Sequence, residues 1–318
     1  MLGSTTMKQL LLILSVSFAL LGCAETTSEA HESTPVAGYP RTVKVFEDRE
    51  LTLQRPIERI IPANTAAMEI LADLGAFDSV LAVPEPAFAY SGHPLERTDW
   101  EGRTFERYLV EPMLAFEPDF VITHAWQNPE TSGFLEENGV AVLDIPIPLS
   151  LDDLLEGIRA TARVLELDER AEELCASLTA RREALANSPH SELRLMTYAS
   201  FGTGSWTAAK NTTADLFIRF AGLRNASAEH GLEGHAAIDV EMLLEIDPDY
   251  LLVGSSQEDP QWSATLDVLR NDESLKTLRA IREDRILVIP LAHYTANSHY
   301  LIDAAEGLAA QVAERERN

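Results

Sequence analysis

The chain has few cysteines and few basic side chains. Its 318 residues include two cysteines, Cys23 and Cys175, and 25 Lys and Arg against 51 Asp and Glu, which gives a formal net charge of -26. Two cysteines exclude a disulfide framework and a multi-cysteine metal site. The excess negative charge repels a phosphate backbone, and the sequence shows no basic patch to offset it, so we expect no nucleic-acid partner.

Long apolar runs are scarce as well. The run Leu10–Leu21 is too short to span a bilayer and is typical of a signal-peptide core. It ends in Leu20-Leu21-Gly22-Cys23, which resembles the bacterial lipobox, where the cysteine is lipidated and becomes the mature N-terminus. Residues 1–23 are therefore predicted to be a lipoprotein signal peptide, and residues 24–40, rich in Thr, Ser, Glu and Ala, a flexible tether. The lipid on Cys23 would hold the protein in the bacterial cell envelope, facing the periplasm or the outer face of the cytoplasmic membrane.

The remainder alternates short apolar strands with helices, and this rhythm repeats after residue 190. Such alternation predicts an α/β fold of two lobes, residues 41–149 and 188–318, with mainly parallel sheets flanked by helices. Between them, residues 150–187 keep an apolar stripe at helical spacing that includes Cys175, predicted to be a structural thiol. This pattern predicts one long linking helix with a bend at Leu167-Asp168, acting as a stiff strut between the lobes.

Several segments resemble, in order, the metal-chelate-binding periplasmic proteins, which are the substrate-binding lipoproteins of ABC importers for ferric siderophores, cobalamin or haem. The resemblance covers nearly the whole mature chain. The segments that carry it are Arg59–Leu71 with Leu74-Gly75-Ala76, Glu111–Ile122, Asn138-Gly139-Val140, Ser150–Asp153, Asp239–Leu244 with Ile246–Asp249, Ile281–Pro290 and Ser298–Leu308.

The resemblance implies a binding protein and not an enzyme. It implies that a metal chelate, first of all a ferric siderophore, is held in a cleft between the lobes, with cobalamin or haem as alternatives. It further implies no cofactor of the protein's own, a monomer, and delivery of the chelate to an ABC permease dimer with its ATPase subunits. In this family one exposed glutamate per lobe meets arginines of the permease, and the matching positions here are Glu111 and Glu241. Alternatively, both are ordinary acids that interact favourably with the dipole of a helix N-terminus.

Side chains that follow the predicted strands are the candidates for contact with the ligand, because α/β folds bind ligands at the carboxyl ends of strands. Their aromatic content suits a flat or macrocyclic ligand, although each aromatic side chain could equally pack on its own lobe. Arg97, Arg103 and Arg107 could pair with an anionic chelate, and Tyr108, His124 or Tyr294 could be an axial ligand of haem. The candidate ligand-binding residues are Asn64, Tyr90, His93, Arg103, Tyr108, His124, Trp126, Trp206 and Tyr294.

Two other functions remain open from the residues alone. Direct capture of Zn or Mn ions would need four ligands, and one histidine falls in each of four predicted loops: His93, His124, His235 and His293. The chain lacks the His/Asp-rich loop common in zinc-capturing proteins. A lipid-anchored hydrolase is a more distant alternative, since Gly254-Ser255-Ser256 lacks the second glycine of a nucleophile elbow.

Overall fold

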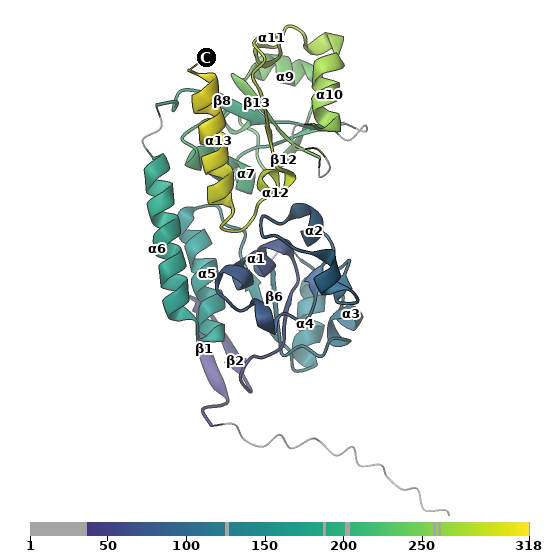
Figure 1. Ribbon diagram of the computed structural model, residues 1–318, viewed down its shortest axis with the longest axis vertical. Helices are drawn as coiled ribbons and strands as arrows, with labels where there is room; N and C mark the ends of the chain where they lie inside the picture. Colours follow the sequence, from purple (N-terminus) through teal and green to yellow (C-terminus); the bar gives the residue numbers. More distant parts are fainter. Residues whose placement is uncertain are drawn as a thin grey trace, which may run out of the picture. The chain divides into compact units, whose positions relative to one another are not determined.

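The computed structural model describes residues 37–124, 127–186, 189–200, 204–256, 259 and 262–317. The predicted signal peptide, Cys23, most of the tether and Trp126 lie outside these residues. No helix in the described part of the chain is long and apolar enough to cross a membrane. We call the elements from β1 to β7 the N-terminal lobe and those from β8 to α13 the C-terminal lobe (Figure 1).

The N-terminal lobe is built on a parallel sheet of order β3-β6-β7, as predicted. Its strands are β3 (Ile60–Pro62), β6 (Phe120–His124) and β7 (Ala141–Ile145), and the first two are buried throughout. Continuous apolar strands of this kind form where helices cover both faces of a sheet. The sequence also predicts a strand over Val80–Val83, but the structure divides it: Val80 forms an isolated parallel bridge with Ile60, and β4 (Val83–Pro84) pairs with β5 (Thr104–Phe105). The helices are α1 (Thr65–Asp73), α2 (Ala87–Tyr90), α3 (Val110–Leu114) and α4 (Pro129–Glu137).

A β-hairpin precedes this sheet, as the sequence predicts. Strands β1 (Arg41–Phe46) and β2 (Arg49–Leu53) pair antiparallel, with Val43 opposite Leu51. The hairpin is fixed to the helix α5 (Leu151–Leu165) through the backbone oxygen of Val45, which accepts a hydrogen bond from Arg163 Nη1 at 2.8 Å.

The C-terminal lobe contains a second parallel sheet, of order β11-β8-β13-β14. The sequence predicts three of these strands: β8 (Arg194–Thr197), β13 (Tyr250–Gly254) and β14 (Ile286–Ile289). It does not predict β11 (Arg224–Asn225), nor the small antiparallel sheet β12-β10-β9. Strands β9 and β11 have two residues each, and β10 and β12 are partly exposed and lack the continuous apolar run of a buried strand. The remaining elements are β9 (Ala199–Ser200), β10 (Ser205–Ala208), β12 (His235–Ile238), α7 (Thr213–Phe220), α8 (Ala226–Glu229), α9 (Val240–Ile246), α10 (Ala264–Asn271), α11 (Arg279–Arg282), α12 (Leu291–Tyr294) and α13 (Leu301–Arg315).

The prediction of one long linking helix is wrong. The segment forms two helices, α5 and α6 (Asp168–Leu185), separated by Glu166, whose φ of 59° lies in the left-handed region and ends α5. The helices fold back on each other, so that Arg159 Nε meets Glu172 at 2.7 Å (Figure 1). Each helix buries one stripe of apolar side chains. The helical spacing of apolar residues therefore continues past Glu166, and the sequence does not show that the chain reverses there.

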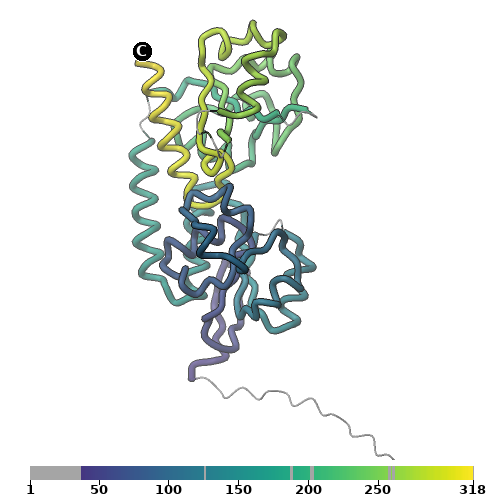
Figure 2. The backbone as a smooth tube through the Cα atoms, turned by 45° about the vertical axis from the view of Figure 1, so that its right-hand side comes forward, coloured from purple at the N-terminus to yellow at the C-terminus, as the bar shows by residue number. Residues whose placement is uncertain are grey.

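Helix α6 then contacts the C-terminal lobe through α13. Arg181 Nη2 lies 2.9 Å from Asp303 and 2.7 Å from Glu306, and Figure 2 shows the two helices side by side. A pair of helices, rather than one strut, thus leads from β7 to β8.

Cys175 is buried between the paired helices, as expected of a structural thiol, and its Sγ lies 3.8 Å from the backbone oxygen of Leu155. Burial raises the pKa of Cys175 to about 11. The reactive thiolate is therefore depleted near neutral pH, by about a hundredfold relative to an exposed cysteine.

We predict that Cys175 in the native protein reacts with iodoacetamide far more slowly than in protein unfolded by guanidinium. Mass spectrometry of the peptide that contains Cys175 measures the reaction separately from Cys23. Equal rates in the two states would contradict the packing of α5 against α6.

Candidate functional site

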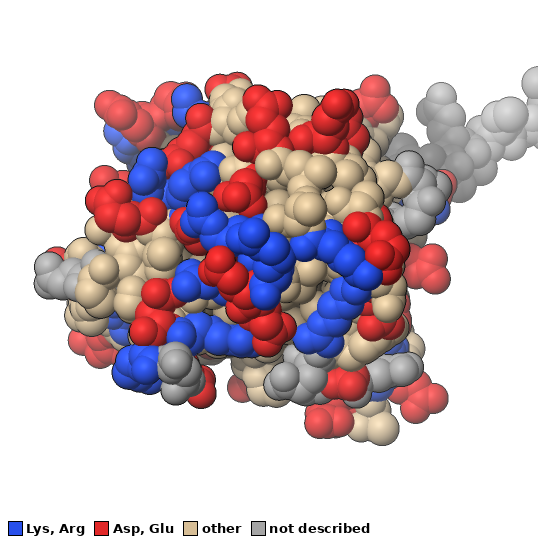
Figure 3. Space-filling view, turned by 90° about the horizontal axis from the view of Figure 1, so that it is seen from above, with Lys and Arg blue, Asp and Glu red and all other residues tan. Residues whose placement is uncertain are grey.

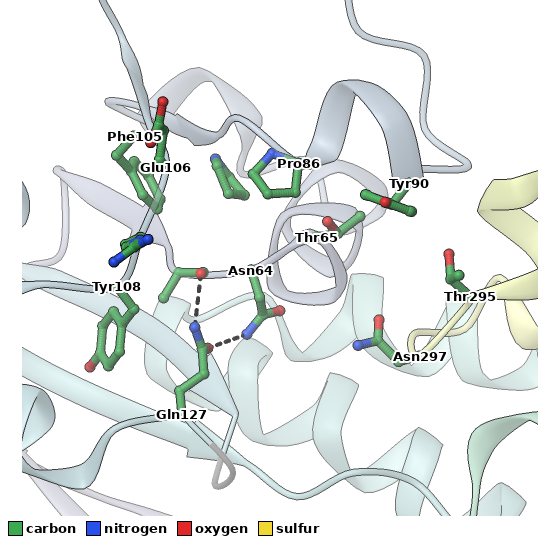
Figure 4. A pocket seen from close by; sticks show the side chains of 13 residues that line it. Asn64, Thr65, Pro86, Tyr90, Phe105, Glu106, Tyr108, Gln127, Thr295 and Asn297 are labelled. Atoms are coloured by element: carbon green, nitrogen blue, oxygen red, sulfur yellow. Dashed lines mark hydrogen bonds between the residues drawn. The ribbon is translucent and has the colours of Figure 1, made fainter. Parts of the chain in front are cut away.

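Two cavities lie at the carboxyl ends of the strands. The first, of about 350 Å³, is lined mainly by the N-terminal lobe, including Asn64 and Tyr108 (Figure 4). The second, of about 560 Å³, is lined mainly by the C-terminal lobe, including Trp206. Thr295 and Asn297 line both cavities. We call Thr295–Asn297 the shared wall; the two cavities meet there, as expected of a cleft between two lobes.

A closed hydrogen-bond network fixes the floor of the first cavity. Asn64 is the N-cap of α1, where its Oδ1 accepts from the backbone nitrogen of Ala67, and its Nδ2 donates to Gln127 Oε1 at 2.8 Å. Gln127 Nε2 in turn donates to the backbone oxygen of Ala63 at 3.1 Å, as Figure 4 shows. The sequence predicts Asn64 but misses Gln127, whose role depends on the meeting of the β3 and β6 ends.

Aromatic side chains form much of the first cavity. Tyr90 is exposed, whereas Phe105 and Tyr108 are buried. Tyr108 Oη lies 3.0 Å from Ser132 Oγ, and burial raises the pKa of Tyr108 to about 12. Tyr108 is therefore a neutral phenol at physiological pH, and its hydroxyl is engaged within the N-terminal lobe.

The second cavity opens beside β10. Trp206, 41% exposed, lies on this strand opposite Ala237 of β12. Tyr294 lines the same cavity, and burial raises its pKa, so it too is a neutral phenol. The polar part of the lining includes Asn211, Thr212, which is the N-cap of α7, and His235.

Few charged side chains reach either cavity. Among the described lining residues, the ionisable side chains besides the tyrosines are Glu106 and Arg107 in the first cavity and His235 in the second. Arg97 and Arg103, predicted to face an anionic chelate, lie instead over the rings of Phe88 and Trp100, at 4.4 and 4.3 Å from the ring centroids. The lining is thus mainly aromatic, amide and hydroxyl.

The four histidines predicted as an alternative metal site do not come together. His124 is only 2% exposed and its Nδ1 lies 2.8 Å from the backbone oxygen of Ile145, so it belongs to the core; burial lowers its pKa. The ring of His93 packs edge-on against Phe77, at 5.2 Å. No three His, Cys, Asp or Glu side chains in the described residues are placed to hold a metal ion. His235 alone of the four lines a cavity described above.

The two glutamates implied by the family occupy equivalent places. Glu111 lies in the first turn of α3 and Glu241 in the first turn of α9, and both are exposed. Exposed apolar neighbours accompany each: Leu109 precedes α3, and Leu244 lies on α9. Acids in the first turn of a helix also interact favourably with the helix dipole.

Basic side chains concentrate on another face, seen from above in Figure 3, where Asp and Glu are interleaved with them. In the C-terminal lobe such cations pair within the chain: Arg285 Nη1 lies 3.1 Å from Glu316, and Arg194 Nε lies 3.3 Å from Glu229. These arginines are therefore committed to surface ion pairs of the lobe itself.

Comparison with known proteins agrees with this architecture. Residues 60–292 match the family described as periplasmic binding protein. A cobalamin-binding protein of Halobacterium salinarum is 25% identical over 223 residues, which is 69% of this chain and 60% of that protein, so the chain spans about 60% of the length of this relative. The ABC transporter substrate-binding lipoprotein YvrC of Bacillus subtilis is 19% identical over 94% of this chain and 95% of its own length.

Solved structures show the same fold. The periplasmic heme-binding protein RhuT from Roseiflexus sp. RS-1 has a TM-score of 0.69 and 25% identity, covering 81% of this chain and 99% of that chain. The periplasmic heme-binding protein HutB of Vibrio cholerae has a TM-score of 0.70 and 20% identity, covering 80% and 98%. With two lobes, mainly parallel sheets and a family match over most of its length, this chain belongs to the periplasmic binding proteins.

Proposed function

We propose that this protein captures a metal chelate of low net charge in the cleft formed by the two cavities and delivers it to an ABC permease. The observation that carries the proposal is the lining itself. Aromatic and neutral polar side chains from both lobes meet at Thr295 and Asn297, and few charges lie among them. Such a site can enclose a large ligand without a charge partner for it.

A corrinoid is the ligand that fits this lining best. A corrinoid has a macrocycle edged with neutral amide groups, and the cavities offer amides and hydroxyls such as those of Asn64, Asn211 and Asn297 beside Tyr90 and Trp206. Aromatic walls bury a flat ring system with little loss of side-chain entropy. The cobalamin-binding relative of Halobacterium salinarum supports the same class.

The ferric siderophore expected first from the sequence becomes the second candidate. That expectation came from the resemblance, with three arginines as possible partners of an anionic chelate, and only Arg107 of the three lines a cavity, beside Glu106. An anionic chelate would leave its charge largely unpaired there, whereas a neutral ferric hydroxamate would not. Haem is less favoured, because two of the three predicted axial ligands are engaged within the N-terminal lobe: His124 lies in the core, and Tyr108 Oη lies 3.0 Å from Ser132 Oγ.

The exposed glutamates support a docking role toward a dimeric permease. Glu111 and Glu241 lie at matching helix starts on the two lobes. Two separate anionic points on a folded body would fix its orientation through charge-assisted hydrogen bonds to arginines.

The N-terminal segment supports attachment to a membrane surface. The run Leu10–Leu21 ends at the lipobox-like Leu20–Cys23, and residues 24–40 would separate a lipidated Cys23 from the folded body. The protein would then act as a lipid-anchored monomer of the bacterial cell envelope, with the chelate as cargo and no cofactor of its own.

We expect the protein to bind cyanocobalamin with micromolar or better affinity, measured by calorimetry. Trp206→Ala should weaken binding by about tenfold, because it removes an aromatic wall. Trp262→Ala is the matched control: Trp262 is 42% exposed, close to the value for Trp206, lines neither cavity and donates to Asp267, so its loss should change affinity by less than about twofold.

Ferric desferrioxamine and haemin serve as competing probes in the same measurement. Binding of ferric desferrioxamine alone would replace the corrinoid by the second candidate. Binding of haemin alone, or equal effects of the two tryptophan variants, would contradict the assignment of the cleft.

Glu111→Lys and Glu241→Lys should each reduce uptake of cyanocobalamin by cells while leaving its affinity for the isolated protein unchanged. Glu169→Lys is the matched control, since Glu169 is an exposed acid in the first turn of α6. A helix-dipole role alone predicts a similar small loss of stability, about 0.3–1 kcal/mol, in all three variants and no selective loss of uptake.

Cys23→Ser should move the protein from the membrane fraction to the soluble fraction of the cell. Fractionation measures the shift, and mass spectrometry of the N-terminal peptide should show a lipidated Cys23 in the unaltered protein. An unmodified Cys23 in the mature protein would contradict attachment through a lipid.

A further inference from the structure

We propose that Glu69 is a positioning residue of the binding site, because through Ser298 it holds the shared wall of the two cavities in place. The inference rests on the proposed function, in which the shared wall touches the ligand. It assigns a role to a buried carboxylate that lines neither cavity.

Glu69 is buried on α1, with 2% of its surface exposed. Its Oε1 accepts hydrogen bonds from Ser91 Oγ at 3.0 Å and from the backbone nitrogen of Gly92 at 2.6 Å. Its Oε2 accepts from Ser298 Oγ at 2.5 Å, and Ser298 is 1% exposed. A buried carboxylate is costly unless it is hydrogen bonded, so this group holds its three donors firmly. One oxygen serves the N-terminal lobe, and the other serves the start of the segment that leads into α13.

The two residues after Ser298 are held by the same region. His299 Nε2 lies 2.6 Å from Asp73, which is one turn after Glu69 on α1, and this contact lowers the pKa of Asp73. The Tyr300 ring lies against Gly92, where an added Cβ would be 2.4 Å from Tyr300 Cδ1. The segment Ser298–Tyr300, which we call the anchor, is therefore fixed residue by residue to the N-terminal lobe.

The shared wall precedes the anchor directly in the chain. Consecutive Cα atoms are about 3.8 Å apart, so fixing Ser298 limits how far Asn297 can move. Figure 4 shows Asn297 and Thr295 on one side of the first cavity, with Phe105 and Tyr108 on the other. Ala296, between them, is buried. The width of the cleft at its centre thus depends on a bond made outside both cavities.

The chain offers a matched pair of variants. Ser298→Ala removes the bond to Oε2 of Glu69, and Ser91→Ala removes a bond to Oε1 of the same carboxylate. Each serine also accepts one backbone hydrogen bond two residues on, from Tyr300 or from His93. Glu69→Gln keeps its oxygen toward the backbone nitrogen of Gly92 and turns its amide nitrogen toward Ser298, whose hydroxyl can then accept a neutral hydrogen bond in place of the charged one.

We expect Ser298→Ala to speed hydrogen exchange of the backbone amides from Thr295 to Leu301 and to weaken cyanocobalamin binding by about tenfold. Glu69→Gln should change both quantities in the same direction but by less, because a neutral hydrogen bond to Ser298 remains. Ser91→Ala should leave the exchange rates and the affinity within about twofold of those of the unaltered protein, even if it lowers the melting temperature as much as Ser298→Ala does. A purely structural role predicts that stability falls in all three variants and that affinity and local exchange do not separate them.

Equal effects of Ser298→Ala and Ser91→Ala on exchange, or faster exchange with unchanged affinity, would overturn the proposal. If the unaltered protein does not bind cyanocobalamin, the corrinoid assignment fails on its own. Exchange of the shared wall in the unliganded variants then still decides whether Ser298 positions it.

Discussion

The fold depends on one connection: between the last strand of the C-terminal lobe and α13, the chain runs back to α1 of the N-terminal lobe. In this connection, Ser298 binds Glu69 and His299 binds Asp73, and both acids lie on α1. Burying a carboxylate costs free energy, and hydrogen-bond donors that stay in place offset this cost. Two of the three donors to Glu69 belong to the N-terminal lobe. The contact therefore joins the lobes at the point where their cavities meet.

The charged side chains lie mainly on the surface of the protein and not in the cavities. The formal net charge is -26, yet few ionisable side chains line the cavities. The acidic side chains lie mainly on the surface, where they favour solubility and where Glu111 and Glu241 are available to a partner. The cleft is left to aromatic and neutral polar groups, which can hold a chelate without neutralising it.

Sequence patterns were sufficient for the local features of the fold. The hairpin β1-β2, the strand β3 and the repetition of strands and helices in two lobes all follow from short-range rules. The reversal at Glu166 does not, because two helices packed on each other keep the same apolar period as one long helix.

The candidate site could be predicted only in part, because the direction of a side chain depends on tertiary packing. Asn64, Tyr90, Tyr108, Trp206 and Tyr294 line the cavities. His124 and Arg103 follow strands in the same way but turn into the core or onto Trp100. Gln127, Glu69 and Ser298 carry no signal in a single sequence, since each matters through a residue far along the chain.

The central claim is that one ligand occupies both cavities at once. Hydrogen exchange with and without cyanocobalamin tests it most directly. We predict protection in residues 105–108 and 206–214 together with the shared wall at 295–297. Protection confined to one lobe, or none in the shared wall, would contradict a cleft that closes on a single chelate from both sides.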